Sequence, residues 1–326
     1  MIDSRASETP SAEPKPAAAT TAPQKRQGWM AILRWLPVVV VVLGCLYLAR
    51  SVDVPALKAS LLSVSLLPLG LGLVFATLST VAHAGYWRVM VRTVAPVSLL
   101  AMTVYTFASY ATNAFLPMRA GEALRVGMVK KRYGVPLGLS GAIIALEKVA
   151  DTLSLLILVT PLPWLIPDLP PSIGKALRIL PCIVAGGAVA IAIAGRHSSR
   201  WTFLSGFSVV KKPGVIAAGF ACVLGAWLLD LSCILSCMQA VHVGPTIERA
   251  LVVILLVNIA VAVPATPGQV GAHELGSTVA LRLVGVPEAQ AIPFALFYHA
   301  TQLLPVLLIG LSTARALSKH MEEPQV

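Results

Sequence analysis

The stretch Asn113-Ala-Phe-Leu-Pro-Met-Arg-Ala-Gly-Glu-Ala-Leu-Arg125 places a helix-breaking proline, a glycine and three charged side chains between long apolar runs. An ionisable side chain inside a bilayer costs about 2.5 to 3.5 kcal/mol on insertion scales, so charges in such a place indicate a functional site. The residues that we expect to form this site are Asn113, Pro117, Arg119, Gly121, Glu122 and Arg125.

The composition around this stretch is that of an integral membrane protein. Of 326 residues, 57% are hydrophobic and 12% are charged, whereas soluble domains carry about 25% charged residues. A membrane-spanning helix needs roughly 20 apolar residues, and most of the apolar runs here have that length. The eight runs cover residues 29–49, 61–82, 98–116, 137–160, 176–194, 214–240, 250–263 and 289–312. We therefore predict an all-α polytopic membrane protein.

The net charge of +11 does not indicate a nucleic-acid partner, because the basic residues lie between the apolar runs instead of forming one patch. This distribution is typical of the positive-inside rule and of contact with anionic lipid headgroups. All five cysteines lie within apolar runs and have no other metal-ligating residues around them. We expect no disulfide, no metal and no cofactor.

The ends of the chain are expected to be cytoplasmic tails. Residues 1–28 are rich in Pro, Ala, Ser and Thr and predict a disordered tail. A cleavable signal peptide is not expected, because the first apolar run begins only after Lys25 and Arg26. The predicted organisation is a tail over 1–28, a transmembrane domain over 29–315 and a second tail over 316–326.

The positions of Lys and Arg decide between two topologies. If all eight runs crossed the membrane, the basic triplet at 130–132 would lie outside. If the chain instead enters at Ser98, breaks at Leu116-Pro117 and returns from Arg119, both ends of this hairpin are cytoplasmic. A second hairpin, broken at Pro264 to Gly268, then enters from the outside. We predict six full spans with two re-entrant hairpins, and eight spans as the alternative, in the cell (inner) membrane with both termini cytoplasmic.

An internal repeat supports the two hairpins. Pro117-x-x-x-Gly121 is followed by Gly134-Val-Pro136, and Pro267-x-x-x-Gly271 is followed by Gly285-Val-Pro287. Three spans lie between the two copies in this topology, so the copies point in opposite directions. Inverted repeats with broken helices form the central binding sites of many transporters.

Charged side chains cluster on the first hairpin. Arg119, Glu122 and Arg125 are spaced so that Glu122 could bridge both arginines on a helix. Arginine binds phosphate through two parallel hydrogen bonds, which favours a lipid phosphate as ligand. In the next helix Glu147 and Asp151 share a face. They need cationic partners, for which the hairpin arginines are candidates; a buried ion network that only docks the hairpin is the alternative.

The second hairpin and the last helix supply the other candidates. Those on the hairpin are Pro267, Gly268, Gly271 and Glu274, while for His273 a binding role and a solvated external position both stay open. On the last helix Tyr298, His299 and Gln302 align through the repeat with Glu147, Lys148 and Asp151. Asp230 is an isolated intramembrane carboxylate, either a proton carrier or the partner of Lys148.

These motifs together resemble the lysylphosphatidylglycerol synthase transmembrane-region family, also called flippase-like. They are Asn113 with Leu-Pro-x-Arg-x-Gly-Glu-x-x-Arg, then Glu147-Lys-x-x-Asp151, and Pro-x-Thr-Pro-Gly-x-x-Gly-x-x-Glu from Pro264 to Glu274. The resemblance implies a module that moves an aminoacylated, polyprenyl-linked or hopanoid-related lipid between leaflets. The full synthases continue into an aminoacyl transferase domain, which this sequence lacks, and the family tends to have arginine where His299 stands.

We therefore expect a lipid transporter that moves a phospholipid or isoprenoid-type lipid and binds membrane lipids through these residues. One alternative is a non-transporting scaffold of a lipid-synthesis enzyme, which would then be a protein partner. A remote alternative is an intramembrane serine protease, suggested by Gly138-Leu-Ser140-Gly141. We expect no enzymatic activity, since no transferase domain or nucleotide-binding motif occurs. The sequence leaves open the lipid, its direction, the energy source and the oligomeric state.

Overall fold

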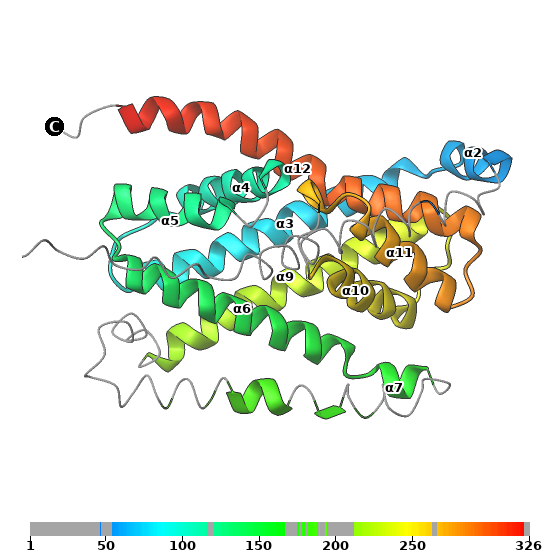
Figure 1. Ribbon diagram of the computed structural model, residues 1–326, viewed down its shortest axis with the longest axis horizontal. Coiled ribbons are helices and arrows are strands. Elements are labelled where there is room, and N and C mark those ends of the chain that lie inside the picture. Colours follow the sequence, from blue (N-terminus) through cyan, green and yellow to red (C-terminus); the bar gives the residue numbers. More distant parts are fainter. Residues whose placement is uncertain are drawn as a thin grey trace, which may run out of the picture.

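The computed structural model describes residues 54–116, 120–166, 212–262 and 266–322, and scattered positions at 46, 175, 178–179, 182–187, 189 and 193. The described elements are all helical, as predicted, and several long helices run side by side along the molecule (Figure 1). The predicted tail over 1–28 and nearly all of the predicted span over 29–49 lie outside the described residues. So do much of the span over 176–194 and residues 117–119 and 263–265.

Four long helices match predicted apolar runs. They are α3 (Leu66–Val91), α6 (Leu137–Val159), α9 (Pro213–Ala240) and α12 (Glu288–Glu322). Within the described residues α3, α9 and the part of α12 up to Thr313 are long and apolar enough to cross a membrane. At 1.5 Å per residue, α6 is about 35 Å long and also has the length of a span, although it carries Glu147, Lys148 and Asp151.

The first predicted break forms a helical hairpin from α4 (Leu99–Phe115) and α5 (Ala120–Tyr133). Helix α4 ends at Leu116, whose backbone is extended (φ −105°, ψ 135°), as the residue before a proline prefers. The two helices are antiparallel and touch closely at Gly121, where a Cβ atom would lie 1.9 Å from the Ser109 carbonyl oxygen. Only glycine fits this crossing without a shift of the backbone.

The second predicted break also separates two packed helices, α10 (Ile247–Val261) and α11 (Ala272–Leu283), with a short 3-10 turn η2 (Pro267–Gln269) between them. Gly268 (φ 61°) and Gly271 (φ 87°) have left-handed backbones, which glycine adopts at little cost. The Glu274 carboxylate accepts the Gly271 N–H at 2.7 Å and thereby caps α11. This turn brings the polar end of the hairpin into the middle of the molecule.

Two short helices were not predicted from the sequence. They are α2 (Val54–Leu62), between the first two apolar runs, and α7 (Leu162–Leu165), directly after α6. Both lie at the end of the molecule away from α5 (Figure 1). Single-turn and two-turn helices such as these leave little periodicity in a sequence.

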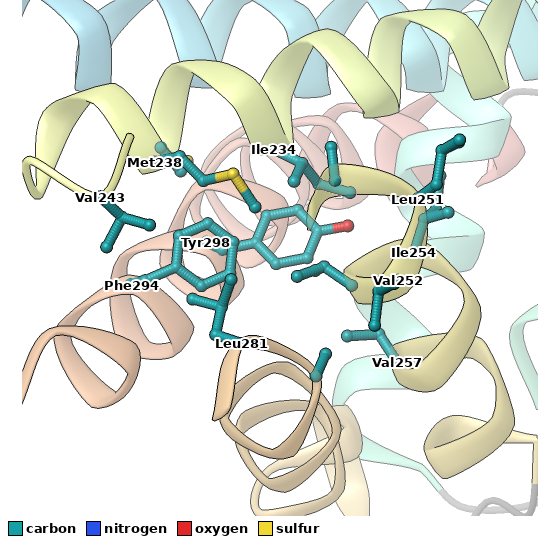
Figure 2. Packing of buried hydrophobic residues seen from close by; sticks show 14 of the residues in the cluster. Ile234, Met238, Val243, Leu251, Val252, Ile254, Val257, Leu281, Phe294 and Tyr298 are labelled. Carbon is teal, nitrogen blue, oxygen red and sulfur yellow. The ribbon is translucent and has the colours of Figure 1, made fainter. Parts of the chain in front are cut away.

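Each hairpin has its own apolar core. Figure 2 shows the second one, where the rings of Phe294 and Tyr298 from α12 lie between Ile234 and Met238 of α9 and Leu281 of α11. The other core joins α3, α4, α5 and α6 around the fully buried Trp87. A cavity lies between these two cores.

Helix α12 connects the two halves. It crosses α4 so closely that a Cβ atom on Gly310 would lie 2.6 Å from the Phe107 carbonyl oxygen. At the tip of the second hairpin, a Cβ atom on Gly268 would lie 3.4 Å from the Ala114 carbonyl oxygen, near the end of α4. The tips of the two hairpins therefore meet.

Candidate functional site

A cavity of about 610 Å³ lies where the hairpin tips meet. Its walls come from α3, α4, α5, α6, α9, α10, α11, α12 and η2, and many of the lining side chains are polar. The structure brings six of the site residues predicted from the sequence into this lining: Asn113, Glu122, Asp151, Gly268, His299 and Gln302.

The remaining predicted residues lie elsewhere. Gly121 is at the α4–α5 crossing, and its N–H donates to the Asn113 side-chain oxygen at 2.7 Å, which fixes the amide of that cavity residue. Pro267, Gly271 and Glu274 shape the tip of the second hairpin. Arg125 and Glu147 are buried, and Pro117 and Arg119 lie outside the described residues.

Arg125 and Glu147 form a buried ion pair between α5 and α6. Arg125 Nη2 donates to Glu147 Oε2 at 3.0 Å, and the two side chains are 1% and 2% exposed. Trp87 Nε1 donates to the same oxygen at 3.0 Å, and the Arg125 guanidinium lies 4.2 Å from the centre of the indole ring. The predicted pairing of a hairpin arginine with Glu147 is thus found, but the guanidinium does not face the cavity. This pair fits the docking alternative.

Glu122 pairs with Lys148, and the prediction that it bridges both hairpin arginines is wrong for Arg125. Lys148 Nζ lies 3.1 Å from Glu122 Oε1, and both side chains line the cavity. The physical reason is that Glu147 on α6 draws Arg125 into the protein interior, so Glu122 one turn away meets the neighbouring cation of α6 instead. Lys148 is the lysine that the described part of the chain presents to the cavity.

Asp151 has partners that the sequence did not predict. Trp227 Nε1 of α9 donates to its carboxylate at 3.3 Å, and His83 Nδ1 of α3 lies 4.0 Å away. Glu147 and Asp151 were both expected to pair with hairpin arginines. Glu147 pairs with Arg125, whereas Asp151 has no arginine partner within the described residues.

His299 connects the last helix to the second hairpin. Its Nδ1 lies 2.6 Å from Glu274 Oε1, and its Nε2 lies 3.0 Å from the Gly268 carbonyl oxygen. The Gly268 carbonyl accepts a hydrogen bond, so Nε2 donates to it. The two contacts of the ring hold α12 against the tip of the second hairpin.

His273 is buried, so the solvated external position considered for it is wrong. Its side chain is 5% exposed, lines the cavity, and stacks on the ring of His299 at a centroid distance of 4.4 Å. It also lies 4.8 Å from the ring of Tyr298. The reason is the capped start of α11, which turns this residue toward α12.

Asp230 accepts hydrogen bonds from side chains of α12 and does not pair with Lys148. Tyr298 Oη donates to the two carboxylate oxygens at 3.4 and 3.2 Å, and Gln302 Nε2 donates as well. Of the two alternatives for Asp230, the pairing with Lys148 is therefore absent, because that lysine is held by Glu122. Of the six aligned positions on α6 and α12, five line one space: Lys148, Asp151, Tyr298, His299 and Gln302. The sixth, Glu147, is buried against Arg125 instead.

Sequence reasoning missed His83, Trp87 and Trp227. In an apolar run a tryptophan resembles a lipid-facing residue, and its N–H donor becomes informative only when an acceptor is known to lie opposite. Trp87 and Glu147 are 60 residues apart. The serine of the protease alternative, Ser140, is fully buried, and its hydroxyl has no hydrogen-bond partner among the described residues.

A family model described as the lysylphosphatidylglycerol synthase TM region matches residues 34–310. This range contains all the residues that line the cavity. No curated protein matches the chain.

Proposed function

We propose, from the premise that this chain belongs to the lysylphosphatidylglycerol synthase transmembrane-region family, that it moves a phospholipid or isoprenoid-type lipid between leaflets. The chain is a multi-pass membrane protein, as the family and its long apolar helices indicate. The observation that carries the proposal is the polar cavity of about 610 Å³ at the junction of two hairpin tips. Ligand pockets in proteins have volumes of about 300–1,000 Å³ and place a few polar groups among apolar ones, so this cavity has the room and the lining for a small polar group such as a lipid headgroup.

The lengths of the hairpin helices support a re-entrant arrangement. Helices α4, α5, α10 and α11 have 17, 14, 15 and 12 residues, or about 18–26 Å at 1.5 Å per residue. A bilayer core is about 30 Å thick, so these helices enter it without crossing. Irregular backbone at that depth is tolerated where it lines a polar cavity. Six full spans, two inverted hairpins and cytoplasmic termini in the cell membrane are the topology that we propose.

The headgroup binds at the wall formed by α5 and α6. Lys148 is 42% exposed and pairs with Glu122 at 3.1 Å. A partly exposed ion pair of this kind contributes little energy, so a lipid phosphate can take the place of that carboxylate. Arg119 is the second phosphate ligand that we propose from the sequence. Arg125 acts indirectly, by holding α5 against α6 through Glu147.

The acyl chains remain in the bilayer beside the cavity. Leu116 lines the cavity and is 51% exposed, and the adjacent Phe115 is 56% exposed. These side chains at the end of α4 give the cavity an apolar mouth toward lipid. The protein thus supplies a polar path for the headgroup and performs no bond-making chemistry, which we assign to a separate lipid-modifying enzyme.

Reconstitution into liposomes tests the function. Vesicles with fluorescent phospholipid or polyprenyl-phosphate lipid in both leaflets are treated with a membrane-impermeant quencher, and the protected fraction is followed over time. The protein should speed leaflet exchange well above protein-free vesicles, and Lys148→Ala should slow it at least tenfold. The matched control is Lys130→Ala, an exposed lysine at the end of α5, which should keep the rate. Exchange no faster than in empty vesicles for every lipid class refutes the proposal.

Cysteine labelling tests the topology. Single cysteines replace Lys130 and the exposed Leu283, at the far end of α11, in a chain from which the five native cysteines have been removed. In intact cells or oriented vesicles an impermeant maleimide should label position 283 from outside, and position 130 only after the membrane is opened. Labelling of both positions from the same side contradicts the inverted arrangement.

A further inference from the structure

Asp230 is distinguished from the other membrane carboxylates by its partners. It lies in α9, lines the cavity, and accepts hydrogen bonds from the neutral side chains of Tyr298 and Gln302. Within the described residues no Lys, Arg or His nitrogen lies within 4.0 Å of it. Each other carboxylate that lies among the central helices has a basic side chain within 4.0 Å: Glu122 with Lys148, Glu147 with Arg125, Asp151 with His83, and Glu274 with His299.

An ionised carboxylate without a counter-charge is costly in a membrane core, and such groups mark proton pathways. Binding a proton removes the charge and keeps both partners, because a neutral carboxyl group still accepts hydrogen bonds. The cavity gives this group a path to water. Asp230 thus has the access and the surroundings that a reversible proton site requires.

We propose that Asp230 is a proton-binding site whose loading and release are coupled to lipid movement through the cavity. This inference rests on the proposed transport function and adds its energy source. Asp230 is neutral while the cavity is closed from water, and it releases its proton when the cavity opens to the other side. The lipid moves between these two states, with one proton for each lipid.

Several titratable or charged groups face the same space and compete with Asp230 for this role. Helix α3 contributes His83, and α6 contributes Asp151 and Lys148, which pairs with Glu122. Helix α11 contributes His273, α12 contributes Tyr298 with His299, and α4 contributes Tyr110; α10 contributes the non-titrating Asn258. Cys233 of α9 is buried outside the cavity lining but interacts electrostatically with Asp230. The experiment must therefore separate Asp230 from the His83–Asp151 pair above all.

The test combines transport with spectroscopy on the full-length protein. Proteoliposomes with labelled phospholipid are prepared with equal pH on both sides or with a difference of one pH unit, and valinomycin with potassium holds the membrane potential at zero. With one proton per lipid, the gradient shifts the ratio of labelled lipid between leaflets about tenfold. Asp230→Asn should bring that ratio back to one. In infrared difference titrations the wild type should show one protonated-carboxyl component that Asp230→Asn lacks and His83→Gln keeps.

Controls decide between the outcomes. Glu248→Gln changes a partly exposed carboxylate at the start of α10, outside the cavity lining, and should keep both the tenfold shift and the infrared band. A shift that survives in Asp230→Asn but is lost in His83→Gln overturns the proposal in favour of the other pair. If lipid movement by the wild type does not depend on the pH gradient, or depends on a sodium gradient, the proton-coupling proposal is overturned while the transport function stands. If no lipid moves at all, the transport function fails, and the infrared band alone decides whether Asp230 binds a proton.

Discussion

The buried pair of Arg125 and Glu147 gives the most quantitative prediction. Glu147→Gln keeps an oxygen for the Trp87 N–H but leaves Arg125 without a counter-charge at a position where the side chain is 1% exposed. Removing one partner of a buried ion pair costs about 3–5 kcal/mol. We expect the free energy of unfolding to fall by that amount.

Replacing both partners should cost much less. In Arg125→Met with Glu147→Leu no charge is left unpaired, and apolar replacements of buried ion pairs are often neutral. The remaining loss comes from the Trp87 N–H, whose acceptor has been removed, and amounts to about 1–3 kcal/mol. The double variant should therefore be more stable than the single Glu147→Gln variant, although it carries more substitutions.

Unfolding by sodium dodecyl sulfate in mixed micelles, followed by circular dichroism, measures both variants, with Glu248→Gln, a partly exposed carboxylate, as the control. A loss below about 1 kcal/mol in Glu147→Gln, or a double variant less stable than the single one, would refute the reasoning. The same double variant separates two roles of Arg125. It should retain lipid movement if the arginine only docks α5, and lose it if the guanidinium binds lipid.

Two further predictions concern the hairpins. Gly121→Ala places a methyl group 1.9 Å from a carbonyl oxygen of α4 and should lower the free energy of unfolding by about 1–3 kcal/mol. The control is Gly127→Ala, in the same helix with open space around it. It should be neutral or stabilising in the same denaturation assay. If both alanine variants behave alike, the close crossing does not exist in the membrane. Glu274→Gln weakens the contact to His299 and the hydrogen bond from the Gly271 N–H, so the tip of the second hairpin should become more mobile. A cysteine at this tip should then react faster with a maleimide. An unchanged reaction rate argues against a role of Glu274 in holding the tip.

The sequence predicted the helices and their breaks because both depend on local features. A proline after Leu116 stops α4 whatever surrounds it, and the apolar run from Leu137 ends within one residue of α6. The pairing of Glu147 with a hairpin arginine was also predictable, since few cations lie at that depth.

Which cation meets which carboxylate was less predictable. Glu122 and Arg125 have the right helical spacing to pair, yet Arg125 turns to another helix, where burial makes the interaction stronger. The direction of a side chain at the junction of two helices depends on their packing, which helical spacing alone does not contain. The same holds for His83 and the two tryptophans, whose partners come from distant parts of the chain.

The crossing of Gly310 against Phe107 has a consequence for biosynthesis. These contacts join parts of the chain made far apart in time. At 5–20 residues per second, the ribosome needs about 10–40 s to reach α12 after α4 has been made. During that interval the short, charged first hairpin stands in the membrane without the helix that later covers it. The hairpin is therefore exposed to misassembly until α12 has been made and packs against it.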